Sequence, residues 1–454
     1  MRGGDATIDS RPNSTAGSGT ATAPVSSSYA NYALGVLFAV MVLNFLDRQV
    51  IVIIAEPIKQ DLGLSDGQLG MMSGLSFAIF YTTLGIPIAA LADRWHRGRI
   101  IAIALAVWSV MTIACGMATN FVQLFLARVG VGIGEAGASP PSHSLITDLF
   151  PPEKRASALG IFGMAVPIGS MIAYGLGGWV VDNAGWRTAL FAAGLPGLFV
   201  AAVTLLTVRD PRTPVPLRGL FKTDPARISF SEALGELSRK WTFWNLVLGG
   251  AMIQFAAYGL AAFFGSFFNR LHGMSYSELG FKLMLMVGIS GAVGSYLGGQ
   301  IGDRLVRRSM GLPLKVTMLF FIAAVPAVIG GLYAENPNWS FLGFAVPTFA
   351  ATFYFGPTFS ALQSQARSET RAIAVAIYLL ISSMIGLGLG PTIVGFLSDY
   401  LAGANPTPEA AASGLRQALT INCCAYLLAA LHLYLASRTV AREAVPLTSP
   451  ASAG

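Results

Sequence analysis

Four charged residues interrupt apolar stretches of this sequence that are long enough to cross a bilayer. Asp47 and Arg48 lie within VLFAVMVLNFLDRQVIVII, and Arg128 and Glu135 lie within FVQLFLARVGVGIGE. A charge at the centre of a bilayer costs at least about 2.5–3.5 kcal/mol on insertion scales, so such groups are usually paired and functional. Because two acids and two bases can neutralise each other, the four residues are candidates for one buried cluster.

The chemistry open to this cluster is reversible binding of a proton. Arg128 and Glu135 are seven residues apart, which places them on one helical face. A carboxylate beside a base stays ionised, and desolvation favours its protonation once the base moves away. We therefore predict Asp47 and Glu135 as proton-coupling acids, with Asp47 as the principal acceptor. Arg48 and Arg128 are then charge partners or headgroup-binding residues; a purely structural ion-pair network is the alternative.

The composition indicates which elements must position these charges. The chain has 454 residues, of which 54% are hydrophobic and 11% charged, whereas soluble proteins carry about 25% charged residues. Long apolar stretches recur along the chain, as an all-α membrane protein requires and a β-barrel does not. Cys115, Cys423 and Cys424 lie in apolar stretches without metal-binding or disulfide spacing, so we expect no metal and no cofactor besides the coupling proton.

We predict twelve transmembrane helices, and the basic residues between them give an orientation. The limits are 31–55, 67–92, 99–118, 121–149, 155–181, 187–207, 242–270, 277–302, 313–333, 339–366, 370–399 and 413–437. With both termini on one side, most of the 29 lysines and arginines fall on that side. This excess predicts cytoplasmic termini and a multi-pass protein of the inner (plasma) membrane. The net charge of +7 then reflects topology and not nucleic-acid binding.

The sequence repeats a charged motif. ALADRWHRGR follows the second span and QIGDRLVRRS follows the eighth, and their aspartates are 210 residues apart. Two six-helix pseudo-repeats of this kind are the plan of a secondary transporter, whose binding site lies near the midplane between the halves. We interpret the motif as a cytoplasmic gate, and anchoring by positive charge alone is the alternative. The predicted gate residues are Asp93, Arg94, Arg97, Asp303, Arg304 and Arg307.

The repeat divides the chain into five segments. They are a disordered cytoplasmic tail (1–30), an N-terminal six-helix bundle (31–207), a cytoplasmic linker (208–241), a C-terminal six-helix bundle (242–437) and a second cytoplasmic tail (438–454). The first tail is rich in Ser, Thr, Ala and Gly and has little to bury. A signal peptide is the rival interpretation, but the first apolar stretch is too long for one. Residues 228–238 fit either an amphipathic helix at the membrane surface or a solvated linker.

Several motifs together resemble the major facilitator superfamily over residues 30–437. They are the two DRxxR motifs, RVGVG on the fourth span, PPEKRASALG after it, and AVPIGSMIAYGLGGW on the fifth. NFLDRQV and ARVGVGIGEAGASPPSHSLITDLFPPEKR resemble the spinster family, closely over the first and fourth spans and more loosely in the second half. Ala89 and Trp95-His96 depart from the superfamily motif and fit this branch. The resemblance implies Asp47 and Glu135 as proton-binding acids, and lysolipid-type substrates such as lysophospholipids or sphingosine-1-phosphate.

The second half contrasts with the first because its middle is neutral and aromatic. Spans seven and ten read QFAAYGLAAFFGSFF and FAATFYFGPTFSALQ. An ionic half facing an aromatic half suits an amphiphile, whose charged head would lie beside Arg48 and Arg128. The expected cavity residues are Gln254, Tyr258, Phe263, Thr352, Phe353 and Tyr354, and packing or lipid contact is an equally good explanation of these aromatics.

These features predict a proton-coupled transporter of single-chain amphiphilic lipids that works by alternating access. We expect a lipid substrate, the bilayer as its surroundings, and a monomer. The alternative is a proton-driven exporter of drugs or small organic anions, because Pro167 and the glycines of the fifth span resemble the antiporter signature of drug exporters. We do not expect an enzyme, since no nucleophile–base pair, metal cluster or phosphate loop is present. For His143 we favour an ordinary polar helix residue over a proton relay.

Overall fold

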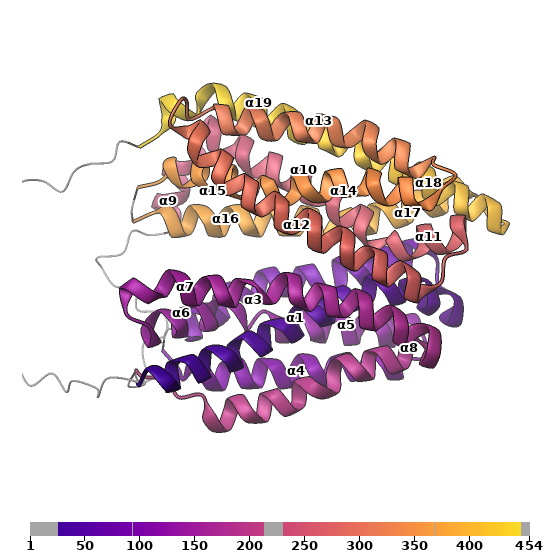
Figure 1. The fold of residues 1–454 in the computed structure, drawn as a ribbon, viewed down its shortest axis with the longest axis horizontal. Coiled ribbons are helices and arrows are strands. Elements are labelled where there is room, and N and C mark those ends of the chain that lie inside the picture. Colours follow the sequence, from indigo (N-terminus) through magenta and orange to yellow (C-terminus); the bar gives the residue numbers. More distant parts are fainter. Residues whose placement is uncertain (1–25, 93, 213–229, 368, 446–454) are drawn as a thin grey trace, which may run out of the picture.

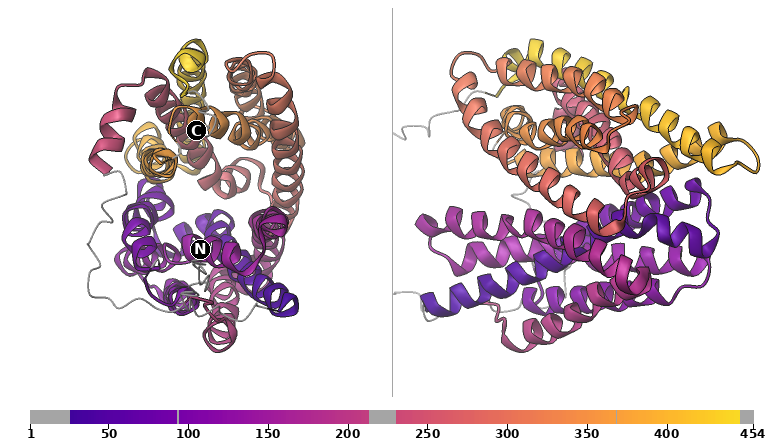
Figure 2. Two further views of the ribbon diagram at one scale, coloured as in Figure 1. Left: turned by 90° about the vertical axis from the view of Figure 1, so that its left-hand side faces the viewer. Right: turned by 45° about the vertical axis from the view of Figure 1, so that its right-hand side comes forward.

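The protein folds into two helical bundles that lie side by side. The structure, a computed structural model, describes residues 26–92, 94–212, 230–367 and 369–445. Within these ranges all regular secondary structure is helical. Helices α1 to α8 form the first bundle and α10 to α19 the second, as Figure 1 and both views of Figure 2 show. We call the end of the molecule where α1 begins and α19 ends the terminal face, and the opposite end the far face.

The helix bounds follow the predicted spans. The first bundle contains α1 (Ser27–Leu62), α2 (Asp66–Gly70), η1 (Met71–Leu75), α3 (Ser76–Ala92), α4 (Arg97–Met117), α5 (Phe121–Glu135), α6 (Ser139–Leu149), α7 (Pro152–Gly163) and α8 (Ala165–Thr207). After α9 (Phe230–Ser238), the second bundle contains α10 (Trp241–Ala262), α11 (Phe264–His272), α12 (Tyr276–Val306), α13 (Leu312–Leu332), α14 (Pro337–Phe353), α15 (Phe355–Ser364), α16 (Arg371–Ser383), η2 (Met384–Leu389), α17 (Gly390–Ala402), α18 (Pro408–Cys423) and α19 (Ala425–Glu443).

These helices make twelve membrane crossings. Ten helical stretches among the described residues are long and apolar enough to span a bilayer. One of them, Pro152–Thr207, makes two crossings because the chain turns at Gly185, whose φ of 81° and ψ of 167° are not helical. Helices α14 and α15 have 17 and 10 residues and together make one further crossing. The predicted all-α fold with two six-helix pseudo-repeats is therefore confirmed.

Some predicted features lie outside the described residues. They are Asp93, most of the first tail, the middle of the linker and the end of the second tail. The end of the linker is described as helix α9, whose Ala233 and Leu237 are fully buried. Helix α9 contacts α10 and α16, so these side chains pack on the second bundle. Within the region 228–238, residues 230–238 therefore form α9, and residues 228 and 229 lie outside the described residues.

Two π-helical segments bring the bundles close together near their middle. Segments η1 and η2 belong to the second and eleventh spans and contact each other. A Cβ atom at Gly74 of η1 would lie 2.7 Å from the carbonyl oxygens of Leu387 and Gly388 of η2, so only glycine fits there. Such bulges are frequent at functional sites. The two spans thus touch along their backbones beside the predicted site.

Candidate functional site

Asp47 lies in the middle of α1, and its carboxylate is almost fully buried, with 2% of the residue exposed. Its Oδ2 atom accepts a hydrogen bond of 2.6 Å from the hydroxyl of Thr112 on α4. Its Oδ1 atom has no hydrogen-bond partner. A neutral hydroxyl compensates a buried carboxylate less than a guanidinium does, so the charge of Asp47 is weakly compensated.

Arg48, the next residue of α1, points to another partner. Its Nη2 atom donates a hydrogen bond of 2.7 Å to Oε2 of Glu135 at the end of α5, and the Glu135 side chain is fully buried. The guanidinium carbon of Arg48 lies 4.7 Å from the ring centres of both Phe77 and Tyr81. An ion pair flanked by aromatic faces holds both charges in place within the apolar interior.

Arg128 is buried without an ionic partner. It lies on α5 with 3% of its surface exposed. Its Nε atom has no hydrogen-bond partner, and no carboxylate within the described ranges forms an ion pair with it. The nearest ring, that of Phe77, is 5.6 Å from its guanidinium carbon. Arg128 therefore offers free donors to an anion, since a buried guanidinium is stable only when it is paired or hydrogen-bonded.

The structure thus divides the predicted charge cluster into parts. It brings Arg48 and Glu135 together, gives Asp47 a hydroxyl partner, and leaves Arg128 available. Thr112 was not predicted from the sequence, because a threonine within an apolar span carries no signal that separates it from packing residues. The assignment of Asp47 and Glu135 as proton-binding acids stays a prediction.

A cavity of about 200 Å³ lies between the two bundles, beside Arg48 and Arg128. The first bundle contributes polar groups to it, including Gln49 and the hydroxyl of Tyr174, which donates a hydrogen bond of 2.8 Å to Gln49 Oε1. The second bundle contributes mostly apolar groups, which are Ala257, Leu260, Ala261, Ala262, Phe264, Val287, Pro347, Ala351, Leu387 and Pro391, together with four residues that carry hydroxyls, Tyr258, Thr348, Thr352 and Tyr426. The cavity therefore has one wall that carries charge and one wall that is mostly apolar.

Two of the six predicted cavity residues line this cavity, and they are Tyr258 and Thr352. Gln254 is half-buried and is not part of its wall. Phe263, Phe353 and Tyr354 are buried in the packing of the second bundle, so the expectation that they line this cavity is wrong for the conformation seen here. The alternative explanation of these aromatics, packing, applies to all three. The sequence does not give the rotation of a helix whose faces are all apolar.

The two copies of the DRxxR motif have different surroundings at the terminal face. Asp303, Arg304 and Arg307 are exposed, and Arg94 is half-buried. Arg97 is buried and forms ion pairs of 2.7 Å with Asp148 and 2.6 Å with Asp210, all within the first bundle. In this conformation Arg97 ties α4 to α6 and to the segment after α8, and not to the second bundle.

Asp210 is part of this cluster, and the sequence did not predict it. Burial raises the pKa of its carboxyl, but the hydrogen bonds that Arg97 and Arg212 donate outweigh burial and hold the pKa below its ordinary value. On α6, the exposed ring of His143 lies 2.9 Å from the carbonyl oxygen of Ser139 and packs edge-on against Phe162. This position agrees with an ordinary polar helix residue.

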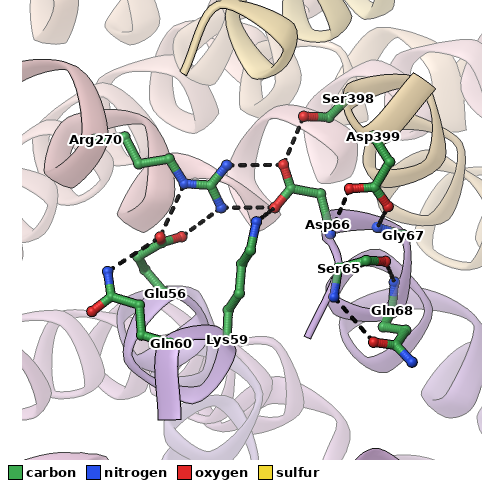
Figure 3. Close-up of polar contacts among 10 residues, drawn as sticks. All are labelled: Glu56, Lys59, Gln60, Ser65, Asp66, Gly67, Gln68, Arg270, Ser398 and Asp399. Atoms are coloured by element: carbon green, nitrogen blue, oxygen red, sulfur yellow. Dashed lines mark hydrogen bonds and ion pairs between the residues drawn. The ribbon is translucent and has the colours of Figure 1, made fainter. Parts of the chain in front are cut away.

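The far face carries a polar network between the bundles (Figure 3). Arg270 of α11 donates to both oxygens of Glu56 on α1, at 3.0 and 2.7 Å, and to both oxygens of Asp66 on α2, at 2.9 and 2.7 Å. Asp66 also accepts from Lys59 and from Ser398 of α17. All side chains around Arg270 are largely buried, so the network closes the far face.

Comparison with known proteins identifies the family. Residues 37–391 match the family model of the Major Facilitator Superfamily. An MFS-type efflux pump of Mycolicibacterium smegmatis is 33% identical over 91% of this chain and 94% of its own. Protein spinster homolog 1 of Rattus norvegicus is 29% identical over 81% of this chain and 72% of its own.

A solved structure is similar over nearly the whole chain. It is the crystal structure of a bacterial homologue of the human lysosomal transporter spinster, in an inward-facing and unoccupied conformation. It superimposes with a TM-score of 0.84 and 33% identity, covering 93% of this chain and all of the other. The DRxxR repeats, the buried charges of spans one and four and these likenesses agree: the chain belongs to the major facilitator superfamily and is a spinster-like member of it.

Proposed function

We propose that this protein is a proton-coupled secondary transporter of single-chain amphiphilic lipids that works by alternating access. The observation that carries the proposal is the cavity with two unlike walls. Arg128, a buried guanidinium without an ion pair among the described residues, lies on one wall, and mostly apolar side chains of the second bundle form the other.

A lysolipid-like molecule matches these walls. Its phosphate would accept hydrogen bonds from the planar fork of Arg128, which suits phosphate oxygens. Its acyl chain would lie along Phe264, Leu260 and Val287 of the second bundle. Ligand pockets usually measure about 300–1,000 Å³, so the cavity of about 200 Å³ must widen to admit a whole lipid.

The proton is expected at Asp47. Glu135 has a guanidinium partner at 2.7 Å, whereas Asp47 has only the Thr112 hydroxyl. Protonation of Asp47 therefore breaks no ion pair, while protonation of Glu135 leaves Arg48 uncompensated. Substrate binding to Arg128 would change the field at Asp47 and so couple the two events.

The excess of basic residues supports an orientation in which the terminal face is cytoplasmic. The far face, where Arg270 joins the two bundles, is then extracytoplasmic, and the conformation seen here is closed at that face. The DRxxR residues Asp93, Arg97 and Asp303 would come together as a cytoplasmic gate in the opposite conformation. We expect a monomer in the inner membrane.

A second candidate function is proton-driven export of drugs or small organic anions. The relative with 33% identity is named an efflux pump, and a carboxylate would pair with Arg128 as well as a phosphate does. The two functions differ in whether they require the apolar wall, because a small anion needs no surface for an acyl chain.

Uptake into proteoliposomes tests the proposal. Labelled lysophospholipid and a labelled small organic anion are compared, with and without a pH gradient, for the wild type, Asp47→Asn and Glu135→Gln. Gradient-driven lysolipid uptake that falls in Asp47→Asn is the expected result. Transport of the organic anion without any movement of lysolipid would favour the exporter instead. Thr83→Ala, an exposed threonine whose hydroxyl bonds only to the Ile79 carbonyl, is a matched control.

A further inference from the structure

Two aspartates at the far face make the same unusual contact with the opposite bundle. Asp182 of α8 accepts hydrogen bonds from the backbone N–H groups of Tyr276 and Ser277 on α12, at 3.1 and 2.7 Å. Asp399 of α17 accepts from the N–H groups of Asp66 and Gly67 on α2, at 2.9 and 2.8 Å (Figure 3). In each case Oδ1 takes the first N–H group and Oδ2 takes the second.

The two contacts are copies related by the internal repeat. Asp399 follows Asp182 by 217 residues, and the first donor residue Tyr276 follows its counterpart Asp66 by 210. The offset of 210 is also that of the two DRxxR motifs. Both helices that donate these N–H groups begin with a serine N-cap, Ser65 and Ser275, at the same offset.

The backbones beneath these contacts repeat as well. A Cβ atom at Gly178 of α8 would lie 2.1 Å from the Tyr276 carbonyl oxygen, and one at Gly395 of α17 would lie 2.1 Å from that of Asp66. Such a distance leaves no room for a side chain, so only glycine allows the two helix backbones to approach this closely. Gly178 and Gly395 are again 217 residues apart. The fifth and eighth spans and the eleventh and second spans thus cross in the same way.

These contacts are strong for a physical reason. The first N–H groups of a helix have no partner within the helix, and its N-terminus carries a partial positive charge. A carboxylate on another helix satisfies both at once. If the bundles separate at the far face, two donors and one charge return to solvent at each crossing.

We propose that Asp182 and Asp399 are a symmetry-related pair of latches that hold the far face closed and are released in each transport cycle. The inference rests on the alternating access of the proposed function, and it holds for any substrate. The latches differ in one respect. Asp182 is exposed, whereas Asp399 is half-buried beside Ser398 and the Arg270 network. Because water screens an exposed group, we expect the Asp399 latch to be the stronger one.

The distance between the bundles at the far face tests the proposal. Spin labels are placed at Thr119, between α4 and α5, and at Glu335, between α13 and α14; both positions are exposed. Pulsed electron resonance then gives the closed and open populations in nanodiscs without substrate, with the native cysteines replaced by serine. Loss of one capping interaction changes the ratio of closed to open molecules by about fivefold. We expect this shift toward the open form for Asp399→Ala, a smaller one for Asp182→Ala, and roughly their product for the double variant.

A matched control removes a carboxylate of the same face that does not join the bundles. Asp61 pairs with Arg187, and both belong to the first bundle. Asp61→Ala should leave the distances unchanged. Asp182→Asn and Asp399→Asn keep one acceptor oxygen and should give intermediate shifts, which also covers the case in which an alanine variant does not fold.

The outcome separates this inference from the proposed function. A wild-type distance distribution in the double variant, or in both asparagine variants, would overturn the latches. Failure of the wild type to transport lysolipid would overturn the substrate assignment and leave the measured distances as they are. If Asp61→Ala increased the open population as much as Asp399→Ala does, the effect would be a general one of charge, and this would also overturn the proposal.

Discussion

Arg48 donates a hydrogen bond of 2.7 Å to Glu135, although its neighbour Asp47 is one residue away in the chain. Successive residues of a helix point in directions about 100° apart, so adjacent opposite charges face different helices. Asp47 therefore turns to Thr112 on α4, and Arg48 turns to α5 and the cavity. The pair of charges in NFLDRQV thus serves two separate contacts.

Asp47→Asn should abolish uptake driven by a pH gradient and preserve exchange of substrate across the membrane. Asparagine keeps an oxygen that accepts from Thr112 but carries no titratable proton. Uptake and counterflow in proteoliposomes measure the two activities separately. Thr112→Val, which removes the hydroxyl and keeps the acid, should retain coupling with a changed pH dependence. Full gradient-driven uptake by Asp47→Asn would exclude Asp47 as the principal proton site.

Glu135→Gln should destabilise the protein more than the double variant Glu135→Gln with Arg48→Gln. Removing one partner of a buried ion pair costs about 3–5 kcal/mol because the other charge stays buried, whereas removing both can be nearly neutral. Thermal unfolding in detergent gives the stabilities of the wild type, the two single variants and the double variant, which form a double-mutant cycle. Additive losses in the double variant would mean that the pair contributes no coupling energy.

Arg128→Lys should weaken substrate binding, and Arg128→Ala should weaken it further. Arg128 forms no ion pair among the described residues, so its donors stay available to an anion. Lysine keeps the charge but loses the planar fork that binds phosphate oxygens. Binding of lysolipid measured by tryptophan fluorescence, beside the melting temperature of each variant, checks both parts. Unchanged affinity in Arg128→Ala would place the headgroup elsewhere.

Arg270→Ala should open the far face, because Glu56 and Asp66 then lose the cation that joins them across the bundles. By the same reasoning on buried pairs, we expect a loss of about 3–5 kcal/mol in the closed state. Hydrogen exchange should become faster in α2 and α11. Arg187→Ala is the matched control, since its partner Asp61 belongs to the same bundle and both side chains are 40–45% exposed. Equal exchange in the two variants would argue against the network as the closure.

Asp210→Asn should lower the thermal stability at neutral pH, and the difference from the wild type should shrink as the pH falls below about 4. The folded pKa of Asp210 lies below its ordinary value because Arg97 and Arg212 bond to it despite burial. A depressed carboxyl pKa stabilises the fold above the unfolded pKa, about 3.9 for aspartate, and the effect is lost as the pH falls through the folded value. Melting temperatures between pH 3 and pH 7 check this, and a difference that grows below pH 4 would contradict it.

The sequence alone determined the architecture and the family. Apolar stretches long enough to cross a bilayer allow only helices there, so hydropathy predicted twelve crossings, which the structure confirms. The repeated DRxxR motif, 210 residues apart, indicated two similar halves. The buried charges Asp47, Arg48, Arg128 and Glu135 were evident because a charge within a membrane helix is costly and therefore rare.

Only the tertiary structure decided which groups meet. Phe353 and Tyr354 are buried in packing while Thr352 lines the cavity, because the rotation of an apolar helix is set by its neighbours. Arg270 and Asp66 are 204 residues apart, and Asp399 and Asp66 are 333 apart. No local pattern couples such distant positions, because their contact depends on how the two bundles close against each other. The charges could be found from the sequence, and their partners could not.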